Sequence, residues 1–547
     1  MPKIDTDVLI VGGGPCGLML ANELGQRGIS TVLYCDREGT SPDPQANATQ
    51  ARTMEHFRRL GFVDEIRDRG LPVDYPTDIA YFTRYTGHEL ARFKLPSSSE
   101  AKKLIKTMTG SWSAAELPHR ISQMYVEQIL RRQAEKLPSI DLNFSAPVIS
   151  VSDQGDFVSA VVEQDGTQKE VRARYLVGCD GPRSLTRKSQ GIEYAGESGV
   201  VREFFGGRMD ATYFRCPKMY EILSGEKAWM YWAFNQDRRS CLVALDGESE
   251  FVYHTQLKPD EENLEIDEAK ALSMFAESMD ADFEIEIISR NSWTAGFALV
   301  AEKFNQGNIF IAGDAAHLFT PTGGLGYNTA VEDAVNLGWK LAAVLKGWGG
   351  KQLLDTYHVE RHQNGVRNTS FARKFADSLG GFSVAPDLED NTEAGTAARK
   401  IAGEYLEAHV RAEFNIPGIT FGYRYDDSPI IVSDGVELPP DVANEYSPTA
   451  SPGGRAPHVW LDEATSLYDK FGFEFTLLRL QDGIDSSVFE RAATARGVPF
   501  TVLDQFDEDL RSLYEADLVL IRPDQIVVWR GNEMDNPESI LAQVTGN

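Results

Sequence analysis

Hydrophobic and polar positions change their period from one segment of the chain to the next. An apolar run at 7–11 predicts a buried strand, residues 18–24 continue with a helical pattern, and a second apolar run at 31–34 predicts another strand. A strand, a helix and a strand in this order predict a βαβ unit with parallel strands. The N-terminal part of the chain is therefore expected to be α/β.

A glycine motif stands at the turn between the first strand and the helix. Gly12, Gly14 and Gly17 form G-x-G-x-x-G, and Asp36 follows the second strand, 19 residues after Gly17. In a dinucleotide site the first glycine permits the tight turn, the second lets the backbone approach a pyrophosphate and the third lets the helix pack on the strand. The helix N-terminus adds free N–H groups for the anion. The motif predicts a dinucleotide site, with an ordinary glycine turn as the alternative.

Three further segments have the apolar spacing of amphipathic helices, at 46–60, 121–137 and 331–345, and helical sequence continues to about 412. Residues 182–290 alternate like an antiparallel sheet, with an acidic helical insert at 266–279. Further strands are predicted at 148–151, 158–162, 171–177 and 308–314.

A stretch rich in proline, glycine and serine at 415–456 is the clearest boundary in the chain. The tail at 457–547 has its own β/α alternation, with strands predicted at 475–478 and 518–521. The tail is therefore expected to be a separate unit.

Composition excludes several classes of protein. The chain of 547 residues is 42% hydrophobic and 25% charged, which is ordinary for a globular enzyme of roughly three domains. The net charge of −28 argues against binding to nucleic acid or to an anionic membrane. We see no apolar segment of membrane-spanning length and no signal peptide before the first strand. Five scattered cysteines predict reduced thiols, a cytoplasmic location and no metal site.

Two later motifs complete a pattern with the glycine loop. G-C-D-G at 178–181 ends one predicted strand, and Gly313-Asp314 ends another, followed by a glycine-rich segment at 323–328. In this order the motifs resemble those of the FAD-dependent aromatic hydroxylases, the p-hydroxybenzoate-hydroxylase-like monooxygenases, over about residues 5–410. The tail resembles the thioredoxin-like C-terminal domain of the phenol-hydroxylase branch, without its C-x-x-C, since no cysteine follows Cys241.

The resemblance implies an α/β fold with a Rossmann-like FAD-binding domain, an inserted, mainly antiparallel β-sheet domain for the substrate, and a thioredoxin-like C-terminal domain. It also implies tightly bound FAD, NADH or NADPH as a transient reductant, and O2 as co-substrate. Packing or assembly into a homodimer or larger homo-oligomer is the expected role of the tail. The expected ranges are 1–75, 104–181 and 290–412 for FAD, 76–103 and 182–289 for the substrate, 413–456 for a linker and 457–547 for the tail.

The family implies FAD contacts in all three motifs. Asp314 would contact the ribityl chain or the pyrophosphate, although an aspartate at a strand-to-helix turn is also typical of a helix cap. Asp180 would lie near both FAD and the passing nicotinamide nucleotide. Backbone N–H groups of 323–328 and a helix N-terminus would face the pyrimidine side of the flavin, where the reduced ring is anionic.

Two predicted helices would add side chains to this site. Arg52, Arg120 and Gln123 would hold the pyrophosphate or the ribityl chain. The residues expected at the cofactor are Gly12, Gly14, Pro15, Gly17, Asp36, Arg37, Arg52, Arg120, Gln123, Asp180, Gly313, Asp314, Gly324, Gly326, Tyr327 and Asn328.

The implied reaction is hydroxylation of a phenolic ring beside an existing hydroxyl, through an FAD C4a-hydroperoxide in a site that excludes water. Relatives often place an aspartate five residues before Arg52; here Asn47 stands there, which can hydrogen-bond a phenol but cannot take its proton. Candidates to assist are His119, Tyr213, Tyr231 and the carbonyl of Pro321. Both tyrosines lie on predicted strands expected to face the flavin, with core packing as the alternative.

Other functions stay open at this level. The same cofactor could serve epoxidation or Baeyer–Villiger oxidation of a polycyclic polyketide. A NAD-dependent dehydrogenase and an FAD-carrying scaffold are further alternatives. A flavin-dependent halogenase is disfavoured, because its W-x-W-x-I-P is absent from the sequence.

Overall fold

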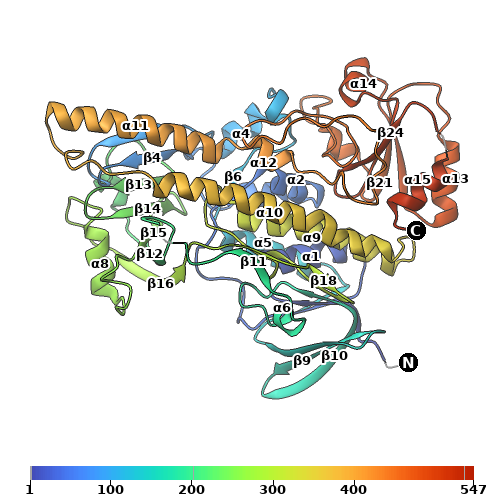
Figure 1. Ribbon diagram of the computed structural model, residues 1–547, viewed down its shortest axis with the longest axis horizontal. Helices are drawn as coiled ribbons and strands as arrows, with labels where there is room; N and C mark the ends of the chain where they lie inside the picture. The colour runs from blue at the N-terminus through green and yellow to red at the C-terminus, as the bar shows by residue number, and fades with distance from the viewer. Residues whose placement is uncertain (1–2, 201, 535) are drawn as a thin grey trace.

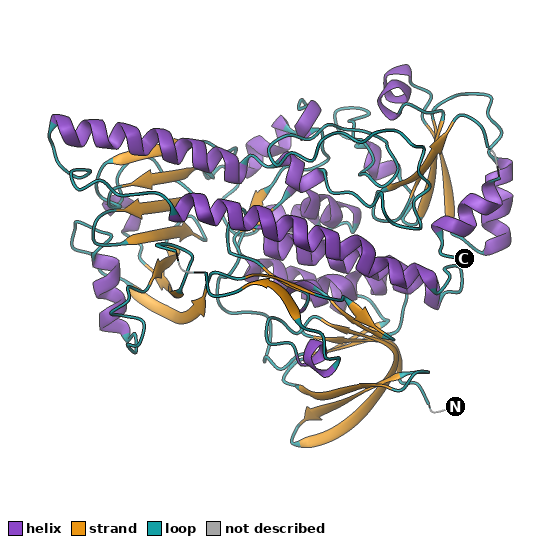
Figure 2. Cartoon of the chain, in the orientation of Figure 1, coloured by secondary structure: helices purple, strands orange, loops and turns teal. Residues whose placement is uncertain are grey.

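The computed structural model describes residues 3–200, 202–534 and 536–547. Three larger β-sheets, of eight, seven and four strands, and two small ones make up the described part of the molecule with their flanking helices, and two long helices run across the front of it in Figure 1. Figure 2 shows the helices gathered over the middle and the sheets at three separate places around them.

The three motifs lie at one edge of an eight-stranded sheet of order β18-β19-β10-β1-β2-β7, with β8 and β9 beside β10. In the parallel register Val11 pairs with Tyr34 and with Gly178, and Gly178 pairs with Ile311. The glycine loop and the two later turns therefore leave the same end of adjacent strands, where ligands of such sheets bind. The strands are β1 (Thr6–Val11), β2 (Thr31–Tyr34), β7 (Ile140–Asn143), β8 (Val148–Asp153), β9 (Val158–Gln164), β10 (Thr167–Gly178), β18 (Asn305–Gln306) and β19 (Ile309–Ile311).

Helix α1 (Pro15–Gln26) packs against both α5 (Gln123–Glu135) and α9 (Leu325–Leu345) on one face of this sheet. The apolar faces that the sequence pattern predicted for these helices form one buried core with the sheet, which includes Leu20 and Leu337. The fold is thus mixed α/β, as predicted.

Two helices begin later or earlier than predicted. Helix α2 (Ala51–Arg59) starts five residues after position 46, because Ala48–Thr49 forms the short strand β3, which pairs with β6 (His119–Arg120). Helix α9 starts six residues before position 331, directly after Gly323 and Gly324, whose φ angles are +65° and +62°. In its first turn the apolar side chains, Leu325 and Tyr327, are two residues apart, which is not the helical spacing.

A second sheet has the order β16-β12-β15-β14-β13-β4-β5, and all its neighbours are antiparallel except β13 and β4. Helix α8 (Glu268–Ala276) covers one face, and the strands come from two separate parts of the chain. They are β4 (Ile79–Phe82), β5 (Glu89–Phe93), β12 (Arg208–Arg215), β13 (Met230–Phe234), β14 (Arg239–Ala244), β15 (Glu250–Gln256) and β16 (Glu286–Thr294). All but the end of β16 fall within the ranges predicted for the substrate domain.

Helices α10 (Gln352–Gly380) and α11 (Glu393–Phe414) link the two sheets (Figure 1). Helix α10 packs along α9, and α11 packs on β5 and β4. Short elements fill the remaining connections: α3 (Val63–Arg67), α4 (Ser98–Leu104), α6 (Leu185–Ser189), α7 (Met219–Ile222), β11 (Tyr194–Glu197), β17 (Ala298–Ala301) and β20 (His317–Leu318).

The tail forms a third sheet of order β22-β21-β23-β24, at the upper right of Figure 1. Before it, the connector holds only one short helix among its described residues, α12 (Pro417–Phe421). The elements of the tail are β21 (Phe475–Arg479), α13 (Ser487–Arg496), β22 (Phe500–Asp504), α14 (Glu508–Tyr514), β23 (Leu518–Ile521), β24 (Val527–Gly531) and α15 (Pro537–Val544). Across the residues described, no helix is long and apolar enough to cross a membrane.

Candidate functional site

The loop after β1 forms an open cradle at the N-terminus of α1. A Cβ on Gly12 (φ +110°) would lie 2.2 Å from the carbonyl oxygen of Cys179, and one on Gly17 would lie 2.0 Å from that of Gly12. A Cβ on Gly14 would meet only the Arg37 side chain, at 3.9 Å, so the space before the helix is open. Gly14 is the N-cap, Pro15 follows it, and no side chain caps the helix in the described structure. Its first N–H groups are therefore free for an anion.

A second helix begins without a side-chain cap close to the same edge. Gly324 is the N-cap of α9, and a Cβ there would lie 2.8 Å from that of Ala48. Gly326 has ordinary room, with Phe319 at 3.5 Å. Asn328 braces this start: its carbonyl accepts from Gln50 N at 2.8 Å, and its amide donates to the Ala48 carbonyl at 2.9 Å. The glycine-rich segment thus directs backbone N–H groups and a helix dipole toward one place.

Two exposed carboxylates stand at the ends of the strands, Asp36 after β2 and Asp314 after β19. The short helical turn at Gly313–Ala315 has no side-chain cap in the described structure, so Asp314 does not act as a cap. Asp180, by contrast, accepts hydrogen bonds from Ser184 Oγ at 2.5 Å and from Thr186 N at 2.9 Å. Asp314 is thus free for a ligand, whereas Asp180 braces the start of α6.

Glu127 on α5 connects two of the predicted residues and was missed by sequence reasoning. Its carboxylate accepts from Arg37 Nη2 at 3.3 Å and from Gln123 Nε2 at 2.8 Å. Arg37 also donates to the Gly13 carbonyl at 3.0 Å. A polar residue one turn after Gln123 on a helix pointing at the glycine loop was the available signal.

Asp333 on α9 is a second residue without a predicted role. It accepts from the Gly313 N–H at 3.1 Å and from Arg361 Nε at 2.8 Å, and His317 Nε2 lies 2.6 Å from the same carboxylate. Burial alone would raise the pKa of Asp333, but His317 and Arg361 hold it below its ordinary value. Asp333 therefore fixes the turn that carries Asp314.

Arg52 does not lie in this cradle. It is 1% exposed, and its guanidinium donates to Tyr423 Oη at 3.0 Å, to Gln525 Oε1 at 2.6 Å and to the Asp524 carbonyl at 2.5 Å. It also pairs with Glu55 at 2.9 Å. The structure therefore corrects the predicted FAD contact: Arg52 fastens α2 to the tail.

The donors and acceptors of the cradle suit a dinucleotide whose pyrophosphate meets α1 and whose ring meets α9. Comparison with family models matches residues 5–372 to an FAD binding domain and residues 449–547 to the C-terminal part of aromatic-ring hydroxylases. The chain belongs to the FAD-dependent aromatic-ring hydroxylases. It is an FAD-dependent monooxygenase.

Relatives of this hydroxylase match it over nearly the whole length. It is 30% identical to 4-methyl-5-nitrocatechol 5-monooxygenase of a Burkholderia species, over 99% of this chain and 97% of the relative. It is 27% identical to phenol 2-monooxygenase of a Pseudomonas strain, over 99% and 92%. The structure of the rebeccamycin biosynthetic enzyme RebC with reduced flavin has a TM-score of 0.89 at 31% identity, covering 100% of both chains.

The two tyrosines predicted to face the flavin of the hydroxylase lie on opposite faces of the second sheet. Tyr231 of β13 pairs with Leu242 of β14, Leu242 pairs with Tyr253 of β15, and Tyr253 pairs with Thr212 of β12, so these four residues share one face. Thr212 is the neighbour of Tyr213 in β12. Because adjacent residues of a strand point to opposite faces, Tyr213 and Tyr231 cannot share one. This corrects the prediction for the pair.

The contacts of each face separate the two roles. Tyr253, on the face of Tyr231, packs on Phe275 of α8 with ring centroids 4.6 Å apart. Tyr231 Oη accepts from the Ala228 N–H at 2.7 Å. On the other face Tyr213 Oη donates a hydrogen bond to Glu250 Oε2 at 2.6 Å. Burial and this hydrogen bond raise the pKa of Tyr213. Tyr231 is therefore a core residue of the face that α8 covers.

His119 is buried beside Arg67. Burial, with the charge of Arg67, lowers the pKa of His119 to about 3, so the ring is uncharged near neutral pH. His119 and Arg120 are adjacent in β6 and point to opposite sides of it. Asn47 is half-buried, and its Oδ1 has no partner among the described residues. Pro321 is exposed, just before the glycine-rich segment at 323–328.

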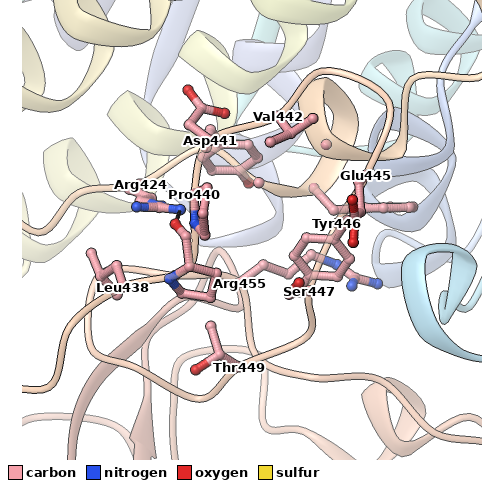
Figure 3. Close-up of a pocket in the computed structure, with 16 residues that line it drawn as sticks. Arg424, Leu438, Pro440, Asp441, Val442, Glu445, Tyr446, Ser447, Thr449 and Arg455 are labelled. Carbon is pink, nitrogen blue, oxygen red and sulfur yellow. Dashed lines mark hydrogen bonds between the residues drawn. The ribbon is translucent and has the colours of Figure 1, made fainter.

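A small hollow of about 30 Å³ lies elsewhere, under the connector (Figure 3). Arg424, Tyr446 and Arg455 are among its lining residues. Arg455 pairs there with Glu55 at 2.5 Å. The hollow holds about one water molecule and is too small for an aromatic substrate.

Proposed function

We propose that this hydroxylase inserts one oxygen atom from O2 into a phenolic ring, beside an existing hydroxyl, with NADH or NADPH as reductant. The observation that carries the proposal is the pair of uncapped helix N-termini at one strand edge, α1 at Gly14 and α9 at Gly324. The Burkholderia and Pseudomonas relatives are both named as monooxygenases of phenolic rings, and this supports the substrate class.

FAD, when bound, supplies the redox chemistry, and this chain binds it, orients the substrate and excludes water. The residues proposed to hold it are those predicted from the sequence, without Arg52 and Arg120 and with Asp180 as a brace. The free N–H groups of α1 would bind the pyrophosphate, and Asp36 the ribose. The N-terminus of α9 would stabilise negative charge on the reduced ring.

The face of the second sheet opposite α8 is the proposed substrate wall. Trp232 of β13 stacks on Tyr81 with centroids 6.0 Å apart and packs edge-on to Phe204 and Phe205. These buried rings keep water from the reacting atoms. Asn47 Oδ1, which lacks a partner among described residues, would accept a hydrogen bond from a phenol hydroxyl.

A screen of simple phenols tests the proposal. Holoenzyme is mixed with NADH or NADPH, substrate-stimulated oxidation of the nicotinamide is followed, and the product is identified by mass spectrometry. A catechol-type product is expected from at least one phenol. Stimulated oxidation that yields only hydrogen peroxide with every phenol would contradict phenolic hydroxylation.

Oxygenation of a polycyclic natural product is the second candidate. The full-length likeness to the rebeccamycin biosynthetic enzyme RebC favours this second candidate. Product analysis with a polycyclic phenol alongside a monocyclic one separates the two candidates.

We propose a thioredoxin-like fold for the tail. Its order β22-β21-β23-β24, with β21 and β22 parallel and the other pairs antiparallel, supports this. The sequence has no cysteine after Cys241, so a thiol redox role is excluded and a packing role remains. We propose a cytoplasmic location as well, since all five cysteines are free thiols. A homo-oligomer is part of the packing role proposed for the tail.

A further inference from the structure

Arg120 is a buried cation that has no polar partner among the described residues. It is 5% exposed, and across the described part of the chain its side chain makes no hydrogen bond or ion pair; Nη1 is fully enclosed. Burial lowers its pKa to about 10, which leaves the guanidinium charged at neutral pH. A buried charge without a counter-charge is costly, so such a group marks a ligand site.

The other described buried arginines of this chain have polar partners. Each of five has a carboxylate partner: Arg52 with Glu55, Arg67 with Glu116, Arg361 with Asp333, Arg455 with Glu55 and Arg522 with Glu360. Arg187, which is 5% exposed, has no carboxylate partner among the described residues either, but its Nη1 donates to the Ile192 carbonyl at 2.8 Å. Among the described buried arginines, Arg120 is the one whose side chain has neither an ion pair nor a hydrogen bond.

Arg120 lies where the cofactor loop meets the second sheet. Its strand partner is Ala48, whose Cβ would be 2.8 Å from a Cβ on Gly324. Its guanidinium lies 4.6 Å from the ring centroid of Trp229, just before β13, and 5.6 Å from that of Phe414, at the end of α11. The cation is thus held by aromatic rings between the start of α9 and the proposed substrate wall.

Aromatic rings hold a guanidinium by its face and leave its N–H edge free for an acceptor. Polar atoms without partners among the described residues occur on neighbouring elements as well: Asn47 Oδ1, Tyr81 Oη and Trp232 Nε1. We propose that Arg120 binds an aromatic oxyanion of the substrate, an ionised phenol or a ring carboxylate. This rests on the proposed function and narrows its substrates to anionic aromatic rings.

The same contact replaces the missing carboxylate base at position 47. A cation next to a phenol favours the ionised form, so the proton leaves to solvent as the substrate binds. Titratable groups around Arg120 are otherwise engaged: Glu413 with Gly323, Asp78 with Arg92, while His119 is uncharged near neutral pH. None of them competes for the guanidinium in the described structure.

The test uses FAD-loaded enzyme and 4-nitrophenol, whose absorbance reports its ionisation. Wild-type enzyme is expected to bind the phenolate at least about tenfold tighter than the neutral phenol, which lowers the ionisation pH of the bound ligand by about one unit. Arg120→Met should remove this preference and weaken binding at least about tenfold, with FAD content unchanged. Arg120→Lys should restore part of it. Benzoate against benzamide as competitors tells whether a carboxylate is the recognised oxyanion.

Arg411→Met is the matched control, because Arg411 is an exposed arginine of α11 that stacks on Phe93 at 5.5 Å. Loss of FAD from Arg120→Met, undiminished nitrophenolate binding by it, or no binding by wild type at millimolar ligand would each overturn the inference. Binding is measured without turnover. If phenolate binding is intact but no phenol is hydroxylated, the proposed function is contradicted and the inference about Arg120 is not.

Discussion

The carboxylate of Glu413, near the end of α11, accepts a hydrogen bond from the backbone N–H of Gly323 at 2.8 Å. The helix that packs on the second sheet therefore holds the loop that begins α9. His409 Nε2 lies 2.9 Å from the other oxygen of the same carboxylate. The position of the flavin-side loop thus depends on a helix some 90 residues away in sequence.

Glu413→Ala is expected to destabilise the protein by about 1–3 kcal/mol, because the buried N–H of Gly323 loses its acceptor. Glu413→Gln retains an acceptor and should cost less. Urea unfolding of the holoenzyme measures both. Exposed Glu407 on the same helix supplies the control, Glu407→Ala, and equal effects of the two alanine variants would contradict the role of Glu413.

Gly14→Val is expected to weaken FAD retention at least about tenfold, on the order of 1.4 kcal/mol, while the fold persists. The backbone at Gly14 suits any residue (φ −80°), and its Cβ would enter open space where the pyrophosphate is proposed to lie. Flavin absorbance per protein after gel filtration measures retention. Gly39→Ala, next to only Arg131 at 3.6 Å, should retain FAD fully.

The Glu55–Arg455 pair predicts an acid-sensitive contact between α2 and the end of the connector. Burial alone would raise the pKa of Glu55, but the charges of Arg455 and Arg52 outweigh burial and lower the pKa from 4.5 to about 2. A lowered pKa gives stability that is present above about pH 4.5 and lost as the pH falls toward about 2, roughly 3 kcal/mol in all.

Glu55→Gln should flatten this part of the pH dependence of the urea midpoint and cost about 3–5 kcal/mol near neutral pH, since two buried arginines lose their counter-charge. A variant with the same acid limb as wild type would assign that limb to other groups.

Tyr231→Phe is expected to leave turnover within about twofold, because Tyr231 lies on the face covered by α8, and to cost about 1 kcal/mol through loss of the acceptor for Ala228 N–H. Steady-state kinetics with the best phenol and thermal unfolding check the two parts. A change in KM without a change in stability would place Tyr231 at the substrate instead.

Asn47→Asp is expected to shift the pH dependence of hydroxylation toward lower pH, because a carboxylate there could take the phenol proton that Asn47 cannot. The pH profile of kcat/KM is measured for both proteins. An unchanged profile removes position 47 from the substrate step.

The strand–loop–helix unit and the three motifs could be predicted from the sequence because each depends on residues close together in the chain. Gly12, Gly14 and Gly17 carry their own geometric requirement, and parallel register then places Gly178 beside Val11 and Ile311 beside Gly178. The local signals were sufficient for the cradle.

Other features depend on partners that no local pattern reveals. Arg52 turns from the cradle because Asp524 and Gln525, more than 470 residues later, supply acceptors for it. The faces of Tyr213 and Tyr231 depend on the register of three pairings across four strands, and a shift of one residue in one pairing would put both on the same face. The start of α9 was hidden because Leu325 and Tyr327, two residues apart, do not have the apolar spacing of a helix.

Two ion pairs, Glu55–Arg455 and Glu360–Arg522, fasten α2 to the end of the connector and α10 to the tail, and all four side chains are fully buried. Separating the two bodies would strand unpaired charges on both new surfaces. The tail is therefore not a detachable module. On heating, the molecule should unfold in one cooperative step, and after cleavage of the connector the two parts should stay bound to each other.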